Sequence, residues 1–396
     1  MKIKKEVIKK ILLIAVFLLQ ASCSHQLNKV PSPDYSWPFY QGNVLRNGYV
    51  ETEFKPQLGR KWTKFLGSIS GSYAPQEYSS PVADDNRIFT ASLSGKGVRA
   101  FNENSGILLW YFKVEKGVEG SPALYEGRVY FGGNDGYLYA VNSETGLLVW
   151  KFNADAEILS SPVADEGIIY FSAANDILYA LDAKTSKLIW RYREGRGAEP
   201  FSVRATSSPA VKDGFVYAGF SNGTVAAIGA YDGSLLWKKR ITGNKSAKFR
   251  DVDSSPVIDE DRLYISSYDA GLFALNVASG EIIWGFEEAG SSKTVVYDKE
   301  SIYYSDNEGR VYSIAKKTGI AKWKFNLEEG VATTPIVIGN YLSFGSSYRY
   351  LYLLDKFNGK EIDRFNTPSG FSSSPIFYKG SLLALSNTGY LYSLGR

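Results

Sequence analysis

Side chains that could carry redox, metal or nucleophilic chemistry are few in this 396-residue chain, which has a single cysteine, a single histidine and a single methionine. The methionine is the initiator and the other two are Cys23 and His25, so the chain beyond residue 25 contains none of the three. That stretch therefore lacks the residues for disulfides, His or Cys zinc sites, Cys–His or Ser–His–Asp nucleophiles, iron–sulfur clusters and haem with its usual ligands. Only Asp, Glu, Lys, Tyr and Ser chemistry remains.

Carboxylates are the remaining candidates for catalysis, because a pair of them can divide the acid and base roles in glycoside cleavage. Asp84-Asp85 and Asp259-Glu260-Asp261 could supply such a pair. Both stand where we expect a turn between two strands, so we interpret them as solvated turn residues. Asp306-Asn307-Glu308-Gly309 is interpreted as a hairpin turn, since the rest of a calcium-loop spacing is absent. The sequence thus predicts a protein that is not an enzyme, with no catalytic residue and no metal site.

The elements that position these residues form an internal repeat. An Ala, a Gly six residues later and a Trp four residues after that recur at Ala100–Gly106–Trp110, Ala140–Gly146–Trp150, Ala227–Gly233–Trp237 and Ala274–Gly280–Trp284. Two more copies carry one substitution each, and a seventh, Leu353–Gly359–Asp363, is decayed. A Ser-Pro or Thr-Pro pair follows most copies, although one unit has Lys293-Thr294 at that place. Residues 57–396 therefore divide into eight units of about 42 residues, the period of a propeller repeat.

Each unit contains four short β-prone runs, for example Ser121–Leu124, Arg128–Gly132, Tyr137–Val141 and Leu147–Phe152. Four strands at this period are typical of a propeller blade. The last unit lacks its outer strand, and residues 58–65 can supply it from the other end of the chain, which would close the ring and remove exposed sheet edges. We therefore predict an all-β, eight-bladed β-propeller of four-stranded antiparallel blades over residues 57–396, with the last blade closed by the N-terminal strand.

The Ala-x5-Gly-x3-Trp spacing resembles the tryptophan-docking motif of pyrroloquinoline-quinone-type propellers, in which each Trp packs between neighbouring blades. The resemblance raises the possibility of a quinoprotein dehydrogenase. Those enzymes, however, carry a disulfide of adjacent cysteines and a Ca²⁺ held beside the quinone, and this chain has no cysteine beyond Cys23. We therefore expect no cofactor.

The N-terminus predicts export. A basic stretch over residues 1–10 precedes the nine apolar residues 11–19, which reach about 14 Å as a helix and fall short of a bilayer span. Residues 1–22 thus read as a signal peptide. Ala21 and Ser22 directly before Cys23 resemble a bacterial lipobox, which implies lipidation of Cys23 and a stable membrane anchor. We expect residues 23–56 to form the lipidated N-terminus and an extended tether; the alternative is an ordinary signal peptide with an incidental cysteine.

Two adjacent connections between units, 191–208 and 238–255, are seven residues longer than the shorter ones. They carry net charges of +2 and +4, whereas the chain from Cys23 onward is neutral, which gives no case for a nucleic-acid partner. Repeated insertions at one point of a repeat often mark the binding face. Apolar and oppositely charged residues in these loops suit a specific protein contact: Phe201, Val203, Arg204, Asp251 and Asp253. The alternative is a pair of solvated loops. A third long connection includes Glu77, whose charge we expect to matter much less for partner binding, since four blades separate it from the pair.

The run 201–204 followed by 250–256, together with the C-terminal run 369–375 and the closing residues 392–394, is similar to the lipoprotein propeller of the outer-membrane β-barrel assembly machinery (the BamB family). The resemblance implies a non-catalytic scaffold whose two loops bind the periplasmic domains of the barrel-inserting protein, next to other assembly subunits. Phe201 and Val203 would be the apolar anchors, and Arg204, Asp251 and Asp253 the polar partners. It also implies a lipid anchor in the outer membrane on its periplasmic face, and a protein that is monomeric by itself. The alternative is a quinone-type propeller that serves another envelope complex or binds a small ligand.

Overall fold

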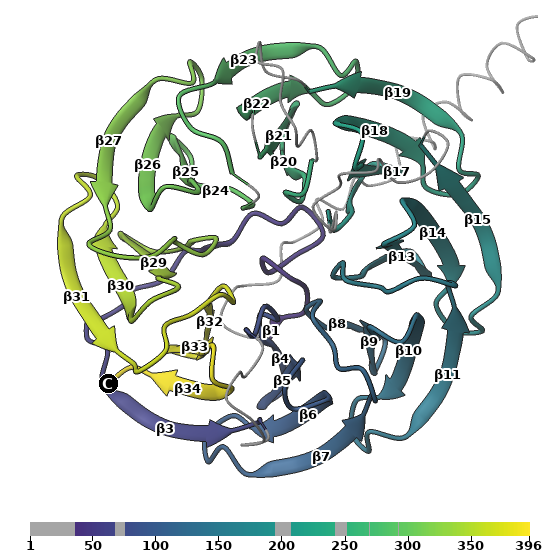
Figure 1. Ribbon diagram of the computed structural model, residues 1–396, viewed down its shortest axis with the longest axis horizontal. Helices are drawn as coiled ribbons and strands as arrows, with labels where there is room; N and C mark the ends of the chain where they lie inside the picture. Colours follow the sequence, from purple (N-terminus) through teal and green to yellow (C-terminus); the bar gives the residue numbers. More distant parts are fainter. Residues whose placement is uncertain (1–35, 68–75, 195–206, 242–251, 269, 292) are drawn as a thin grey trace, which may run out of the picture. The chain divides into compact units, whose positions relative to one another are not determined.

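Blade 2 shows how one repeat folds. Its strands β8 (Ala123–Tyr125), β9 (Arg128–Gly132), β10 (Tyr137–Asn142) and β11 (Leu148–Asn153) form an antiparallel sheet in that order. The strands β8 to β10 are largely buried, whereas β11 alternates between exposed and half-buried residues, as an outer edge strand does. In the computed structural model, which describes residues 36–396 except 68–75, 195–206, 242–251, 269 and 292, this sheet recurs around a ring (Figure 1).

The other complete blades follow the same order from the inner to the outer strand. Blade 1 contains β4 (Val82–Asp84), β5 (Arg87–Ser92), β6 (Gly97–Asn102) and β7 (Leu108–Lys113). Blade 3 contains β12 (Val163–Asp165), β13 (Ile168–Ala173), β14 (Ile177–Asp182) and β15 (Leu188–Arg193). Blade 4 contains β16 (Ala210–Lys212), β17 (Phe215–Gly219), β18 (Thr224–Gly229) and β19 (Leu235–Arg240). Blade 5 contains β20 (Val257–Asp259), β21 (Arg262–Ser267), β22 (Gly271–Asn276) and β23 (Ile282–Phe286).

Blade 6 contains β24 (Val296–Tyr297), β25 (Ser301–Ser305), β26 (Arg310–Ala315) and β27 (Ala321–Asn326). Blade 7 contains β28 (Ile336–Ile338), β29 (Tyr341–Gly345), β30 (Tyr350–Asp355) and β31 (Glu361–Asn366). Blade 8 contains β32 (Ile376–Tyr378), β33 (Ser381–Leu385) and β34 (Tyr390–Leu394). Its outer strand is β3 (Arg60–Phe65), which pairs antiparallel with β34. The predicted eight-bladed propeller and its closure by the N-terminal strand are confirmed.

The repeated tryptophans join each blade to the next one. The indole Nε1 of Trp110 donates a hydrogen bond to the carbonyl of Ser143 at 3.0 Å, and Trp190 donates to Ala230 at 2.8 Å. Each accepting carbonyl lies in the hairpin of the following blade, which also contains the repeated glycine. Gly146 has a φ of +70°, and a Cβ placed there would meet Trp110 at 2.7 Å. The Gly of each motif is therefore needed by the Trp of the preceding blade.

Serines of the Ser-Pro pairs link the blades around the central channel. In each case the backbone N–H before one proline donates to the hydroxyl oxygen of the same position in the next blade. The distance is 2.8 Å from Ser80 N to Ser121 Oγ, 2.9 Å from Ser121 N to Ser161 Oγ and 2.8 Å from Ser161 N to Ser208 Oγ. The series continues from Ser208 N to Ser255 Oγ at 3.1 Å. A small hydroxyl residue is thus required at this repeat position by its neighbour.

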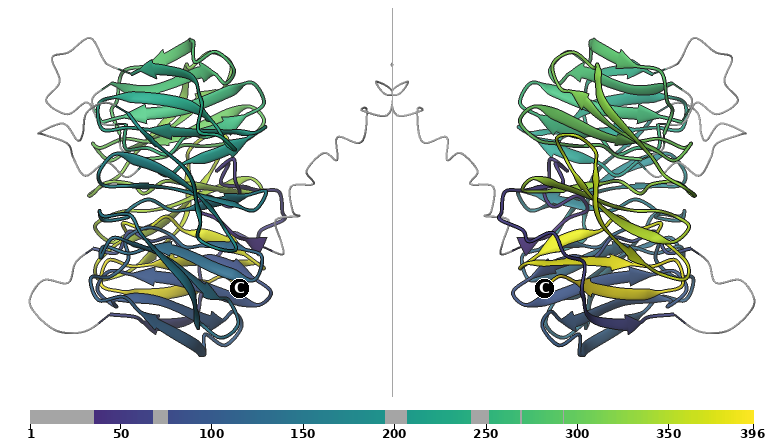
Figure 2. Two further views of the ribbon diagram at one scale, coloured as in Figure 1. Left: turned by 90° about the vertical axis from the view of Figure 1, so that its right-hand side faces the viewer. Right: turned by 90° about the vertical axis from the view of Figure 1, so that its left-hand side faces the viewer.

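The segment before the closing strand crosses the inner strands of the propeller. Its ends form β1 (Ser36–Trp37), antiparallel to β4 in blade 1, and β2 (Tyr49–Val50), parallel to β28 in blade 7. Between them, its carbonyls accept backbone hydrogen bonds from the inner strands of blades 2, 4, 5 and 6. We call residues 36–50 the strap; Figures 1 and 2 show it in purple along one face of the blades.

The strap differs from the extended tether that the sequence predicts over residues 23–56. Residues 23–35 lie outside the described residues, but the side chains of Trp37, Phe39 and Val50 in the strap are buried. Each of these apolar residues meets a different blade, so their spacing has no period that a sequence pattern could reveal. Within the part of the chain that the structure describes, no helix has the length and apolarity needed to cross a membrane.

Arg46 fixes the strap inside the channel. Its side chain is completely buried, and its guanidinium donates from Nε and Nη2 to the carbonyl of Pro209 at 2.9 and 2.7 Å. Further hydrogen bonds reach the carbonyls of Ser161 at 3.2 Å and Tyr40 at 3.1 Å. Burial lowers the pKa of Arg46 to about 10, so the group still carries its charge at neutral pH. Arg46 therefore ties the strap to blades 3 and 4.

Candidate functional site

Most of the residues that the sequence predicts for partner binding lie outside the described residues: Phe201, Val203, Arg204 and Asp251. Asp253 is described. It stands just before the inner strand of blade 5, its residue exposure is 7%, and it has interaction partners. The preceding Val252 is fully buried, and its N–H donates to the carbonyl of Phe220 at 3.3 Å. The end of the second long connection is therefore fixed against blade 4.

Asp253 lines a cavity of about 600 Å³ in the central channel, which we call the channel bowl. All eight blades contribute to its wall, mostly through residues that directly precede the inner strands. Tyr40 of the strap also lines it, and its hydroxyl lies 3.5 Å from Thr294 Oγ1 and 3.2 Å from Thr334 Oγ1. The wall includes two carboxylates, Glu119 and Asp253, and one ammonium, that of Lys293. The sequence could not indicate this cavity, because its lining residues come from every repeat.

Glu77, whose charge the sequence predicts to matter little for partner binding, has a structural role in blade 1. Its side chain is fully buried and accepts hydrogen bonds from Ser92 Oγ at 2.8 Å, Leu93 N at 2.8 Å and Ser94 N at 3.1 Å. Burial raises the pKa of the Glu77 carboxyl, and these hydrogen bonds oppose the rise. Glu77 therefore fixes the β5–β6 connection of blade 1. The sequence could not indicate this role, because the hydrogen-bond donors to Glu77 stand 15 to 17 residues further along the chain.

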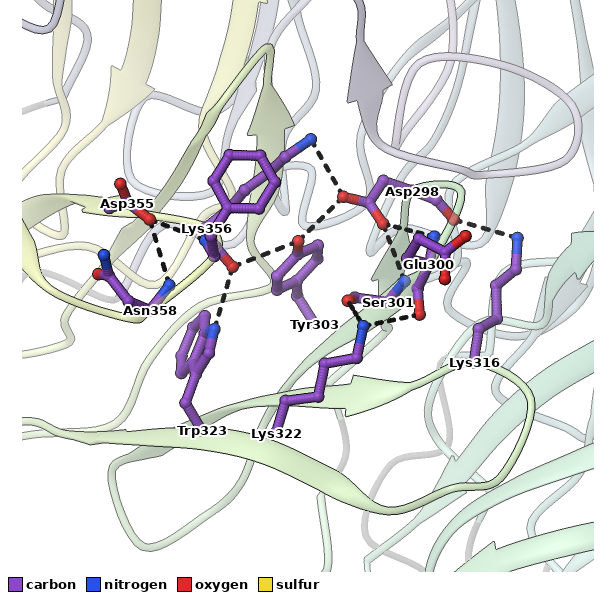
Figure 3. Close-up of polar contacts among 11 residues, drawn as sticks. Asp298, Glu300, Ser301, Tyr303, Lys316, Lys322, Trp323, Asp355, Lys356 and Asn358 are labelled. Carbon is purple, nitrogen blue, oxygen red and sulfur yellow. Dashed lines mark hydrogen bonds and ion pairs between the residues drawn. The ribbon is translucent and has the colours of Figure 1, made fainter.

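A second cavity, of about 1,070 Å³, lies between residues 49–55 and the turns of blades 6 and 7. Figure 3 shows Asp298 at the centre of its polar contacts. Asp298 Oδ2 forms an ion pair with Lys356 Nζ at 3.1 Å and accepts from Tyr303 Oη at 3.0 Å, while Oδ1 accepts from Ser301 N at 2.8 Å. Burial alone would raise the pKa of Asp298, but the hydrogen bonds and the ammonium of Lys356 outweigh burial and lower it. The cluster thus joins blade 6 to blade 7.

The described residues contain no group of three or more His, Cys, Asp or Glu side chains that could hold a metal ion. The carboxylate runs considered for catalysis lie in turns, as the sequence predicts. Asp84 is the last residue of β4, and Asp85 lies in the turn that leads to β5. Asp259 is the last residue of β20, and Glu260 and Asp261 lie in the turn that leads to β21. These turns belong to blades 1 and 5, so the two runs do not form one site.

The fold and its docked tryptophans define the class: an eight-bladed propeller of the quinone-type repeat. The model of one family, described as outer membrane protein assembly factor BamB, matches residues 94–325, more than half of the chain. The chain therefore belongs to the BamB family.

BamB of Escherichia coli (strain K12) is 28% identical over 111 residues, which are 28% of this chain and 28% of that protein. The matched segments span little more than a quarter of the length of such curated relatives. The crystal structure of BamB from Moraxella catarrhalis superposes with a TM-score of 0.74 at 20% identity, covering 86% of this chain and 100% of that chain. Quinohemoprotein alcohol dehydrogenase from Comamonas testosteroni gives 0.76 at 13% identity, covering 91% and 80%. At these identities the structural likeness shows the fold alone.

Proposed function

We propose that this protein is a non-catalytic scaffold lipoprotein of the outer-membrane β-barrel assembly complex, and that it binds the periplasmic domains of the barrel-inserting protein. The observation that carries the proposal is membership of the BamB family over residues 94–325. The names of its relatives describe an assembly factor and not an enzyme. The proposed role requires no metal ion, and the described part of the chain contains no group of three or more His, Cys, Asp or Glu side chains that could hold one.

The partner-binding surface in this proposal consists of the two long connections, with Phe201 and Val203 as apolar anchors and Arg204, Asp251 and Asp253 as polar contacts. The position of Asp253 supports it. The backbone on both sides is held by blade 4 and blade 5, since Val252 N donates to Phe220 O and Ser254 Oγ donates to Ser266 O at 2.8 Å. The backbone that carries Asp253 is thus fixed before a partner binds, so little chain entropy would be lost at this end of the connection on binding.

In the proposal the protein is held by lipid on Cys23, after removal of residues 1–22, at the periplasmic face of the outer membrane. Ser36, where the strap begins on blade 1, stands thirteen positions after Cys23. A fully extended chain of that length reaches at most about 45 Å. Residues 23–35 would thus be the tether, residues 36–56 would belong with the propeller, and the propeller would stay within that reach of the membrane.

Affinity capture from solubilised membranes tests the proposal. The bait is the full chain with a C-terminal tag, and the matched control is the same bait with Glu144→Ala, an exposed acid of blade 2 outside both long connections. We expect both baits to recover the barrel-inserting protein, and the double variant Asp251→Ala/Asp253→Ala to recover much less while remaining folded, as its melting curve should show. Recovery of a different envelope complex, without the barrel-inserting protein, would favour the alternative of a propeller with another partner.

A further inference from the structure

The wall of the channel bowl presents hydroxyl donors that the described part of the chain does not use. Ser121, Ser161, Ser208 and Ser255 line the bowl, and each hydroxyl oxygen accepts a backbone N–H from the preceding blade. None of the four donates its own proton to an acceptor among the described residues. The serines one position earlier behave differently, since Ser160, Ser207, Ser254 and Ser373 donate to backbone carbonyls at 2.7–2.9 Å.

Lys293 stands where the repeat is broken. In most other blades this position is a serine or a threonine, and in blade 2 it is Gly120. The backbone of Lys293 is held on both sides: its N–H donates to Ser291 Oγ at 2.9 Å, and its carbonyl accepts from Ser266 Oγ at 2.9 Å. A long cation at a fixed point of a small-residue ring needs a reason beyond packing, because departures from a local pattern concentrate at functional positions.

The ammonium of Lys293 has no carboxylate within ion-pair distance among the described residues. Two other lysines of low exposure do have one: Lys316 pairs with Asp259 at 2.8 Å and Lys356 pairs with Asp298 at 3.1 Å. Burial lowers the pKa of Lys293, and the neighbouring Tyr40 opposes that shift. A desolvated charge without a counter-ion is costly in a folded protein. The cavity therefore offers an unpaired cation beside a ring of hydroxyl donors.

The size and the remaining groups of the bowl limit what it can take. A volume of about 600 Å³ lies within the range of small-molecule sites. The two acidic groups of the wall, Glu119 and Asp253, both have interaction partners within the protein; Glu119 accepts from Asn134 Nδ2 at 2.6 Å. Tyr78 adds an aromatic surface that is 45% exposed. We propose that the channel bowl binds a small polar molecule with a carboxylate or phosphate group, held by the Lys293 ammonium and by hydroxyls of the serine ring.

Calorimetric titration of the full-length protein with citrate and with inorganic phosphate tests this proposal and separates the two oxyanion types. We expect saturable binding of at least one, weakened at least about tenfold in Lys293→Met, as loss of a charge-assisted contact predicts. Lys299→Met is the matched control, since Lys299 is exposed in the β24–β25 turn of the same blade, and it should bind like the parent. Absence of saturable binding of both anions to the parent, or equal binding by Lys293→Met, would overturn the proposal.

Unfolding of the ligand-free variants gives a second readout. Because Lys293→Met removes a desolvated charge without a partner, the variant should melt at or above the temperature of the parent. Citrate or phosphate should raise the melting temperature of the parent but not that of Lys293→Met. A variant that melts lower than the parent, or fails to fold, would show that the ammonium is already paired in the free protein and would equally overturn the proposal. Neither result depends on the proposed role in barrel assembly.

Discussion

Replacing Arg46 with methionine keeps most of the apolar stem of the side chain and removes every hydrogen bond of its guanidinium. Three carbonyls lose a donor, those of Tyr40, Ser161 and Pro209. A buried carbonyl without a partner costs about 1–3 kcal/mol, and the groups of Ser161 and Pro209 are enclosed by the blades. The substitution also removes a buried charge, whose desolvation is unfavourable, since burial lowers the pKa of Arg46 to about 10. This gain offsets part of the loss. We expect a net loss of about 2–4 kcal/mol in the free energy of unfolding.

Urea unfolding followed by tryptophan fluorescence measures this loss, because the docked indoles become exposed when the blades separate. The matched control is Arg191→Met, since Arg191 is exposed on the outer strand of blade 3 and should change stability by less than about 0.5 kcal/mol. If Arg46→Met and Arg191→Met unfold at the same urea concentration, the strap only rests on the blades and Arg46 does not hold it in the channel.

The other predictions concern single positions. Asp363→Trp, which would restore the repeat motif, should lower the melting temperature, because Asp363 Oδ2 accepts a hydrogen bond from Leu58 N at 2.9 Å; a rise would show that the tryptophan slot is still open. The pKa of Asp298 is lower in the folded protein than in the unfolded chain, where it is about 4, so the ionised carboxylate stabilises the fold above that pH. This stabilisation is lost as the pH falls through the pKa of the folded state. Urea unfolding at pH 5 and pH 3 should therefore show a smaller loss for Asp298→Asn than for the parent, and equal losses would contradict the assignment. Cys23→Ala should move the protein from the membrane fraction to the soluble periplasmic fraction, whereas retention after a carbonate wash would contradict lipid anchoring.

The sequence predicts those parts of the fold that each blade repeats. The spacing of Gly146 and Trp150 recurs because every blade needs the same inter-blade contact, and the orphan strand around Trp62 could be matched to the incomplete last blade. The strap could not be predicted in this way. Its residues form hydrogen bonds with seven blades at irregular intervals, and the burial of Arg46 depends on carbonyls more than 100 positions away.

Some positions at which one blade differs from the repeat have structural roles that the spacing of the motif does not predict. By its spacing, Asp363 occupies a tryptophan position that has been lost. In the structure its carboxylate accepts a hydrogen bond from the backbone N–H of Leu58 and so joins the closing segment to blade 7. Lys293 was visible as a missing Ser-Pro pair, but only the structure puts it beside the hydroxyls of the channel bowl. Glu77 gave no signal, because its burial depends on how one loop folds back on blade 1. Four of the five predicted partner-binding residues lie outside the described residues, so their roles stay predictions.

Binding of purified periplasmic domains of the barrel-inserting protein tests the central claim most directly. Titration of the full chain should show saturable binding, and Arg204→Ala or the double variant Asp251→Ala/Asp253→Ala should weaken it by at least about 2 kcal/mol, roughly thirtyfold. Glu144→Ala should bind like the parent, and melting curves should show that each variant is folded. No binding by the folded parent would contradict the assembly function, and undiminished binding by the folded loop variants would contradict the proposed surface.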